Sequence, residues 1–150
     1  MVVKSFIFGI LLTSLKNNKD MKIILIAGKP NTGKSTTLNI LYDKLTDKGA
    51  RNIIEKRKPV GNKKENDFQC VINWNGKSVA IFSMGDILRD IINAIIQYAH
   101  CDIIILAYNT SFSTKLDVVI EKKNNHCVIK KRAPTDADCN VVIGNIMKYL

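Results

Sequence analysis

The chain has 150 residues, of which 46% are hydrophobic and 24% charged, and its formal net charge is +10. This length fits one domain of ordinary size, and the composition excludes a disordered or low-complexity chain. The positive charge favours anionic partners such as nucleotides, nucleic acid or anionic lipid, but it carries no information about the fold. The four cysteines are widely spaced and only two histidines are present, which argues against a zinc site and favours reduced thiols in the cytoplasm.

The first twenty residues differ in character from the rest. Residues 5–15 are an apolar run, and Met21 follows a polar stretch. The run is shorter than the about 20 apolar residues of a membrane-spanning helix, and no signal-peptide cleavage site follows it. Three interpretations stay open: an element packed on the domain, a segment preceding a true start at Met21, or an export or membrane anchor. We divide the chain into an N-terminal extension at 1–20, which need not belong to the native core, and a domain at 21–150, and expect no stable membrane insertion.

Apolar runs and helical stripes alternate along this domain. The runs predict strands at 22–27, 52–55, 77–83, 102–108 and from 127 onward. Stripes at helical spacing predict helices at 33–48, beyond Asp86, around 116–120 and from Pro134 to the end. Thr135 and Asp138 have the spacing of a capping box at the start of the last helix. Residues 56–66 are expected to form a polar loop.

One hairpin interrupts this alternation. Apolar and polar residues alternate over 67–74, Asn75-Gly76 is the preferred two-residue turn, and 77–83 returns as an apolar strand. The expected fold class is therefore α/β, with a mostly parallel sheet covered by helices on both faces and one antiparallel hairpin at about 67–83.

A glycine-rich segment between the first strand and the first helix carries the clearest chemistry. It matches the pattern G-x-x-x-x-G-K-[ST] with the residues Gly28, Lys29, Pro30, Asn31, Thr32, Gly33, Lys34 and Ser35. Glycines let the backbone curl so that its N–H groups surround phosphates, and the helix N-terminus adds a partial positive charge. In such a loop Lys34 reaches the β- and γ-phosphates and the Ser35 hydroxyl holds Mg²⁺.

At this motif, and in the order of elements that follows, the chain resembles the P-loop nucleoside triphosphatases. The resemblance covers residues 21–150 as an architecture, whereas only the eight-residue motif is specific. It implies a P-loop fold, a nucleoside triphosphate with Mg²⁺ as ligands, and Lys34 as a catalytic contact. It also places Thr36 near the α-phosphate, although Thr36 is equally an ordinary first-turn residue.

P-loop proteins usually place an acid beside the magnesium, at the end of a second buried strand. Asp86 is the best candidate, as a metal-side and catalytic residue or as the N-cap of the helix that follows. Asn109 follows the next buried strand and is expected on the same edge. It contacts the γ-phosphate or the attacking water in one interpretation, and belongs to an ordinary polar loop in the other.

Several cations are candidates for further contacts. Arg89 and Lys115 are each a candidate charge-stabilising finger or a surface charge. The loop at 51–64 holds six basic residues and one acid, so it is either a site for an anionic substrate or nucleic acid, or a solvated loop. A second basic cluster, at 130–132, is expected near the base or ribose.

The branch of the superfamily is not apparent from the motifs. The guanine-reading pattern N-K-x-D is missing after the strand at 102–108, because Asn109 is followed by Thr110. ATP is therefore the default nucleotide, with GTP less favoured. Two functions are compatible with the motif: a Mg²⁺-dependent ATPase or small ATP-dependent phosphotransferase, and a nucleotide-regulated binding module with negligible turnover. The phosphate acceptor and the oligomeric state are not encoded in any recognised pattern.

Base selectivity gives the first testable prediction. Without an acidic base reader, discrimination rests on apolar and backbone contacts, which separate similar ligands weakly. We expect ATP to bind at least as well as GTP, with any preference within about tenfold, or about 1.4 kcal/mol. Competition of GTP against a labelled ATP analogue measures this ratio, and a guanine preference of about a hundredfold would contradict it.

Overall fold

The computed structural model describes residues 9–11, 13, 21–46, 52–61, 66–112 and 126–150. In chain order the domain is built from β1 (Lys22–Gly28), α2 (Lys34–Thr46), β2 (Ile53–Pro59), β3 (Phe68–Trp74), β4 (Lys77–Phe82), α3 (Leu88–Gln97), β5 (Ile103–Asn109), β6 (His126–Lys130) and α5 (Asp136–Met147).

The described strands form one six-stranded sheet in the order β2-β3-β4-β5-β1-β6. The pairs from β4 to β6 are all parallel, whereas β2, β3 and β4 pair in antiparallel fashion. Asn75 and Gly76 both have positive φ, at 53° and 82°, as a type I′ hairpin turn requires. The predicted α/β class, with its mostly parallel sheet and one antiparallel hairpin, is confirmed.

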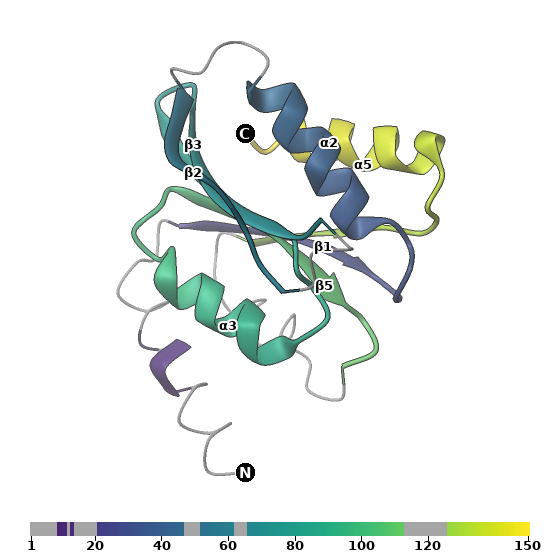
Figure 1. Ribbon diagram of the computed structural model, residues 1–150, viewed down its shortest axis with the longest axis horizontal. Helices are drawn as coiled ribbons and strands as arrows, with labels where there is room; N and C mark the ends of the chain where they lie inside the picture. The colour runs from purple at the N-terminus through teal and green to yellow at the C-terminus, as the bar shows by residue number, and fades with distance from the viewer. Residues whose placement is uncertain (1–8, 12, 14–20, 47–51, 62–65, 113–125) are drawn as a thin grey trace.

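Helices cover both faces of the sheet (Figure 1). Because successive strand residues point to opposite faces, Ile23 and Leu25 pack in the cluster that includes α3, while Ile24 and Ile26 pack in the cluster that includes α2 and α5. All four side chains are fully buried. This explains why β1 is apolar at nearly every position rather than alternating.

One predicted boundary is wrong, and so is one of the two interpretations of Asp86. β2 runs to Pro59, so Lys56–Pro59 belong to a strand and not to the expected polar loop. α3 begins at Leu88 with Ile87 as its N-cap residue and without a side-chain cap, so Asp86 does not cap this helix. The predicted helix around 116–120 lies outside the described residues.

The C-terminal helix has one half of the predicted capping box, because the Asp138 carboxylate bonds Lys131, Arg132 and Ala133. Thr135 is its N-cap residue, and the Thr135 hydroxyl accepts a hydrogen bond from the Asp138 N–H at 3.2 Å. Across the described residues, no helix is long and apolar enough to cross a membrane.

Part of the N-terminal extension contacts the core. Leu11 is fully buried in the cluster on the α3 face, whereas its neighbour Ile10 is 38% exposed. The side chain of Leu11 therefore excludes water from part of the apolar cluster on the α3 face.

These two neighbours provide a matched test of whether the extension contributes to folding. Leu11→Ala is expected to lower the free energy of unfolding by about 2–4 kcal/mol, as for other buried leucines. Ile10→Ala is expected to change it by less than about 1 kcal/mol, because the side chain is partly in water already. Urea unfolding of the full chain measures both, and equal values for the two variants would show that the Leu11 contact does not stabilise the domain.

Candidate functional site

The segment between β1 and α2 forms a tight, curled loop. Asn31 and Gly33 take positive φ, at 64° and 84°, and so reverse the chain before the helix begins. At Gly28 a Cβ atom would lie 2.6 Å from the Lys131 carbonyl oxygen, so only glycine fits there. Gly28 is thus required by the close approach of another segment, and Gly33 by its backbone conformation.

Lys34 is buried within this loop, with 6% of its surface exposed. Its Nζ donates hydrogen bonds to the carbonyl oxygens of Lys29, at 2.8 Å, and Gly28, at 3.2 Å. Burial lowers the pKa of Lys34, with a smaller lowering from the nearby Lys131 charge, while Asp86 opposes both. The Lys34 ammonium is thus in a place where an added anion would be favourable.

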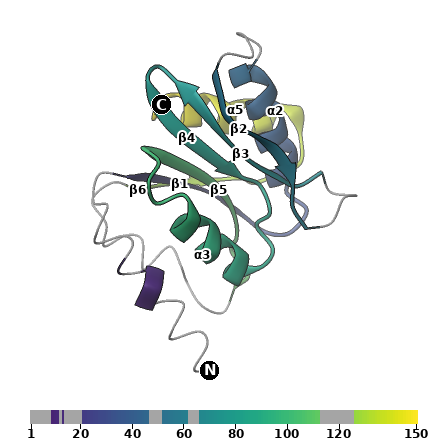
Figure 2. The same ribbon diagram turned by 60° about the vertical axis from the view of Figure 1, so that its left-hand side comes forward.

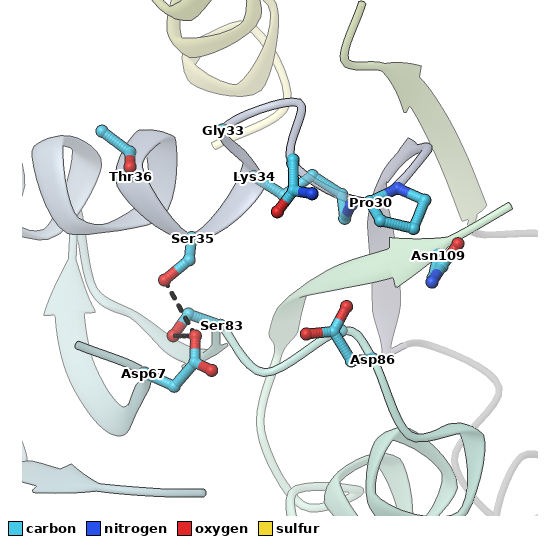
Figure 3. Close-up of a pocket in the computed structure, with 11 residues that line it drawn as sticks. Pro30, Gly33, Lys34, Ser35, Thr36, Asp67, Ser83, Asp86 and Asn109 are labelled. Carbon is cyan, nitrogen blue, oxygen red and sulfur yellow. Dashed lines mark hydrogen bonds between the residues drawn. The ribbon is translucent and has the colours of Figure 1, made fainter. Parts of the chain in front are cut away.

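A pocket of about 590 Å³ opens in front of the loop (Figure 3). Its lining comes from the β1–α2 loop, the start of α2 and the ends of three strands: Pro30, Asn31, Gly33, Lys34, Ser35, Thr36, Asp67, Ser83, Gly85, Asp86 and Asn109. Asp86 and Asn109, selected from separate parts of the sequence, are therefore brought to the same pocket as the motif. Gly28, Lys29 and Thr32 do not line it, and Thr32 instead bonds the Lys29 carbonyl at 2.8 Å.

Asp67 is a residue of this pocket that the sequence did not reveal. It is 5% exposed, and its Oδ1 accepts hydrogen bonds from the hydroxyls of Ser35, at 2.8 Å, and Ser83, at 3.2 Å. The Ser83 oxygen in turn accepts from the Phe68 N–H at 2.8 Å. In the sequence Asp67 is simply the first residue of the hairpin, and only its tertiary position brings it to the motif serine.

The far side of the pocket is fixed by backbone contacts. The Asn109 N–H donates to the Gly85 carbonyl at 3.1 Å, and the Thr110 N–H donates to the Gly28 carbonyl at 3.1 Å. The Asn109 Oδ1 accepts from the Ser111 N–H at 2.9 Å. Asn109 is therefore held in a turn and also lines the pocket, and its contact with a phosphate or a water stays a prediction.

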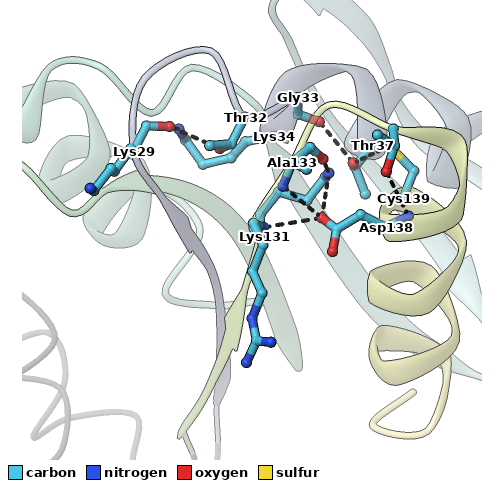
Figure 4. Close-up of polar contacts among 11 residues, drawn as sticks. Lys29, Thr32, Gly33, Lys34, Thr37, Lys131, Ala133, Asp138 and Cys139 are labelled. Carbon is cyan, nitrogen blue, oxygen red and sulfur yellow. Dashed lines mark hydrogen bonds and ion pairs between the residues drawn. The ribbon is translucent and has the colours of Figure 1, made fainter.

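The β6–α5 connection supports the loop from behind (Figure 4). Lys131 is buried, and its Nζ contacts the Ala133 carbonyl and forms an ion pair with the Asp138 carboxylate at 2.6 Å. The same carboxylate oxygen accepts from the Arg132 and Ala133 N–H groups. Lys131 is thus a buried member of the predicted basic cluster, already paired with an acid.

Helix α5 also contacts the start of α2. The Thr37 hydroxyl bonds the Gly33 carbonyl at 2.8 Å and the Cys139 sulfur at 3.1 Å. Gly33 also lies against Pro134, because a Cβ atom added at Gly33 would be only 3.1 Å from the Pro134 Cα. The loop is therefore packed between α2 and the chain that enters α5.

The other cations that the sequence singled out do not share one environment. Arg57 packs over the rings of Phe68 and Tyr42, at 4.0 and 5.1 Å, and its guanidinium bonds the Asn39 side chain. Arg89 is exposed and does not line the pocket. Lys115 lies outside the described residues.

The residues present fit a magnesium–nucleotide better than a bare metal site. In the described part of the chain, no group of three or more His, Cys, Asp or Glu side chains could hold a metal ion. Ser35 and Asp67 instead supply two adjacent oxygen groups, and Mg²⁺ usually takes its other ligands from water and substrate phosphates. A search of protein-family models, curated proteins and solved structures returned no match to this chain.

The ion pair between the buried Lys131 and the half-buried Asp138 predicts an acid-dependent stability. The Lys131 hydrogen bond lowers the pKa of Asp138 from its ordinary 3.8, and bonds from Ala133 and Arg132 add to this. A depressed carboxyl pKa contributes stability above the unfolded-state pKa, and the contribution is lost as pH falls through the folded-state value. We therefore expect the parent to lose unfolding free energy below about pH 4 more steeply than Asp138→Asn does.

Denaturant unfolding at a series of pH values measures this slope. Asp136→Asn is the matched control, because Asp136 is an exposed acid in the same helical turn. Identical acid slopes for the parent and Asp138→Asn would show that the ion pair does not contribute.

Proposed function

We propose that the chain binds a nucleoside triphosphate with Mg²⁺, with ATP as the preferred nucleotide, and acts as an ATPase or a small ATP-dependent phosphotransferase. The observation that carries this proposal is the position of the buried Lys34. It lies at the N-terminus of α2, beside the curled loop, and lines a polar pocket. Loop N–H groups and the helix dipole favour anions at this point. The curled loop and the polar pocket support a P-loop fold, in agreement with the motif at 28–35.

In this proposal phosphate oxygens replace the two carbonyl oxygens as hydrogen-bond acceptors of the Lys34 ammonium. Gly28 and Lys29 offer neutral acceptors to a buried ammonium, and a phosphate offers a charged one, so the exchange favours binding. The same anion would raise the Lys34 pKa, against the lowering caused by burial.

The two carboxylates of the pocket take separate roles. Asp67, hydrogen-bonded to Ser35, would help this hydroxyl hold Mg²⁺, whose charge stabilises the negative charge of the phosphates during transfer. Asp86 is exposed in the pocket and near enough to Lys34 to influence its pKa. In this proposal Asp86 accepts a proton from an attacking water or an acceptor hydroxyl.

A nucleotide-regulated binding module is the second candidate, and one contact chain favours it. The Asn39 amide donates to the carbonyls of Ser35, at 2.9 Å, and Asn66, at 3.2 Å, while Arg57 of β2 bonds the Asn39 oxygen. The pocket is thereby connected to the basic edge strand, where Lys56 and Lys58 are exposed. Phosphate release with and without added acceptors separates the two candidates, because a module shows binding with negligible turnover.

Lys34→Ala tests the central contact. The parent should be stabilised by Mg-ATP, by about 2.7 kcal/mol at a hundred times the dissociation constant, which raises the melting temperature by several degrees. In Lys34→Ala that shift should be largely lost while the unliganded protein stays folded, because the buried charge is not needed for packing. Lys44→Ala removes an exposed cation from the same helix and is expected to keep the shift. An unchanged shift in Lys34→Ala would refute this role for Lys34.

Asparagine substitutions test the division between the two acids. Asp86→Asn should bind Mg-ATP normally but lose turnover by about 10²–10⁴-fold, as for removal of a general base. Asp67→Asn should weaken the dependence of nucleotide binding on Mg²⁺. Asp43→Asn, an exposed acid on α2, is the control for charge alone. Steady-state phosphate release and Mg²⁺ titrations provide the readouts, and full activity in Asp86→Asn would remove it from the mechanism.

A further inference from the structure

A second groove lies on the opposite side of the β6–α5 connection from the phosphate loop. It has a volume of about 590 Å³ and is formed by β6, the residues that follow it and one side of α5: Cys127, Val128, Ile129, Lys130, Arg132, Asp138, Val141, Asn145, Lys148 and Tyr149. Two of these residues also support the phosphate loop: Asp138 forms the ion pair with Lys131, and the Arg132 N–H donates to the Asp138 carboxylate. None of the residues of this groove lines the pocket in front of the phosphate loop.

Among the described strands, β6 lies at one edge of the sheet (Figure 2). Just beyond it, the Lys131 N–H donates to the Ala27 carbonyl of β1 at 2.7 Å. Because N–H and C=O groups alternate in direction along a strand, Val128 and Lys130 direct theirs away from β1. In the described part of the sheet no further strand pairs with this outer side of β6, where these main-chain donors and acceptors lie.

One face of helix α5 forms a wall of the groove. Residues 138, 141, 145 and 148 recur at spacings of three and four and so share one face, while Val142, Ile143 and Ile146 of the other face are buried in the core. Val141 is 61% exposed, Tyr149 42% and Val128 38%. The groove thus combines a strand edge with apolar side chains beside it.

The charge of the groove is positive. Lys130, Arg132 and Lys148 line it and are exposed, whereas its acid, Asp138, is engaged by Lys131. Nearby cations attract acidic groups and repel a second basic surface. A second copy of this chain docked through the same edge would bring these cations against their equivalents, which is unfavourable.

The two edges of the sheet differ in a way that singles out β6. At the other edge, β2 has register shifts in its pairing with β3 and ends at Pro59, and both features disfavour strand addition. The described pairing of β6 with β1 is regular over its five residues. Of these two edges, β6 is the one that can accept another strand.

We propose that this β6–α5 groove binds an extended acidic peptide of a partner protein, which adds a strand to β6 and places alternate apolar side chains against Val141 and Tyr149. Main-chain hydrogen bonds supply affinity in this mode, and the pockets for alternate side chains supply specificity. A peptide satisfies the strand edge, the apolar side chains and the cations together. A single-stranded nucleic acid would use the cations alone, with Tyr149 as the one aromatic ring among the described residues of the groove.

Selection from a phage-displayed library of random peptides on the immobilised full chain tests the proposal. The expected result is enrichment of sequences in which acidic and apolar residues alternate. The enriched peptide, made synthetically with a fluorescent label, should lose at least tenfold in affinity on Val141→Glu and on Lys148→Glu, and its affinity should fall as salt rises.

Ile54→Glu, which changes an exposed apolar residue on the β2 edge, is the matched control and should leave peptide affinity unchanged. Circular dichroism confirms that Val141→Glu folds, as expected for a side chain so exposed. Lys34→Ala should also leave peptide affinity unchanged, because it acts only at the phosphate loop, so failure of the nucleotide proposal is distinguishable from failure of this one.

Three results would overturn the proposal. One is the absence of an alternating acidic pattern among selected peptides, and another is peptide binding that Val141→Glu does not weaken. The third is evidence that the groove serves another partner while no peptide binds. That evidence would be binding of a single-stranded oligonucleotide, or concentration-dependent dimerisation in sedimentation. In either case Val141→Glu and Lys148→Glu would abolish the interaction.

Discussion

The close approach of the β1–α2 loop to the chain that follows β6 is the constraint on which the candidate site depends. Gly28 leaves no room for a side chain beside the Lys131 carbonyl, and Gly33 lies against Pro134. Lys131 is buried and is fixed in turn by its ion pair with Asp138. Because the loop is fixed between these contacts and α2, its N–H groups and Lys34 are arranged before any ligand arrives, and such preorganisation reduces the cost of binding.

Charge is distributed unequally between the two buried lysines of this region. Lys131 has a carboxylate partner, whereas Lys34 bonds two neutral carbonyl oxygens and has its pKa lowered by burial. The charge of Lys131, which supports the loop, is thus already neutralised by a carboxylate. Lys34, inside the loop, would therefore gain more interaction energy from an incoming anion. In the proposed function that anion is the β,γ-phosphate group, with Ser35 and Asp67 beside it.

The sequence predicts the parts of this site that depend on consecutive residues. The motif at 28–35 and the buried strands come from local patterns, and Gly33 has the positive φ of the curled loop that the motif implies. The close approach of Gly28 to the Lys131 carbonyl is a tertiary contact that the motif does not reveal. Asp67 could not be predicted, because its contact with Ser35 depends on the pairing of the hairpin with the rest of the sheet. Polar composition likewise misled at β2, where Arg57 is accommodated by packing over Phe68 and not by solvent.

Amide NMR can establish whether the backbone of the β1–α2 loop surrounds phosphates, as the proposed function requires. Titration of the ¹⁵N-labelled chain with Mg-ATP, with inorganic tripolyphosphate and with adenosine separates phosphate recognition from base recognition. We predict large shifts of the N–H signals of Gly33, Lys34 and Ser35 with both phosphate ligands and small shifts with adenosine. Unchanged signals for these three residues at saturating Mg-ATP would show that the loop does not bind phosphate.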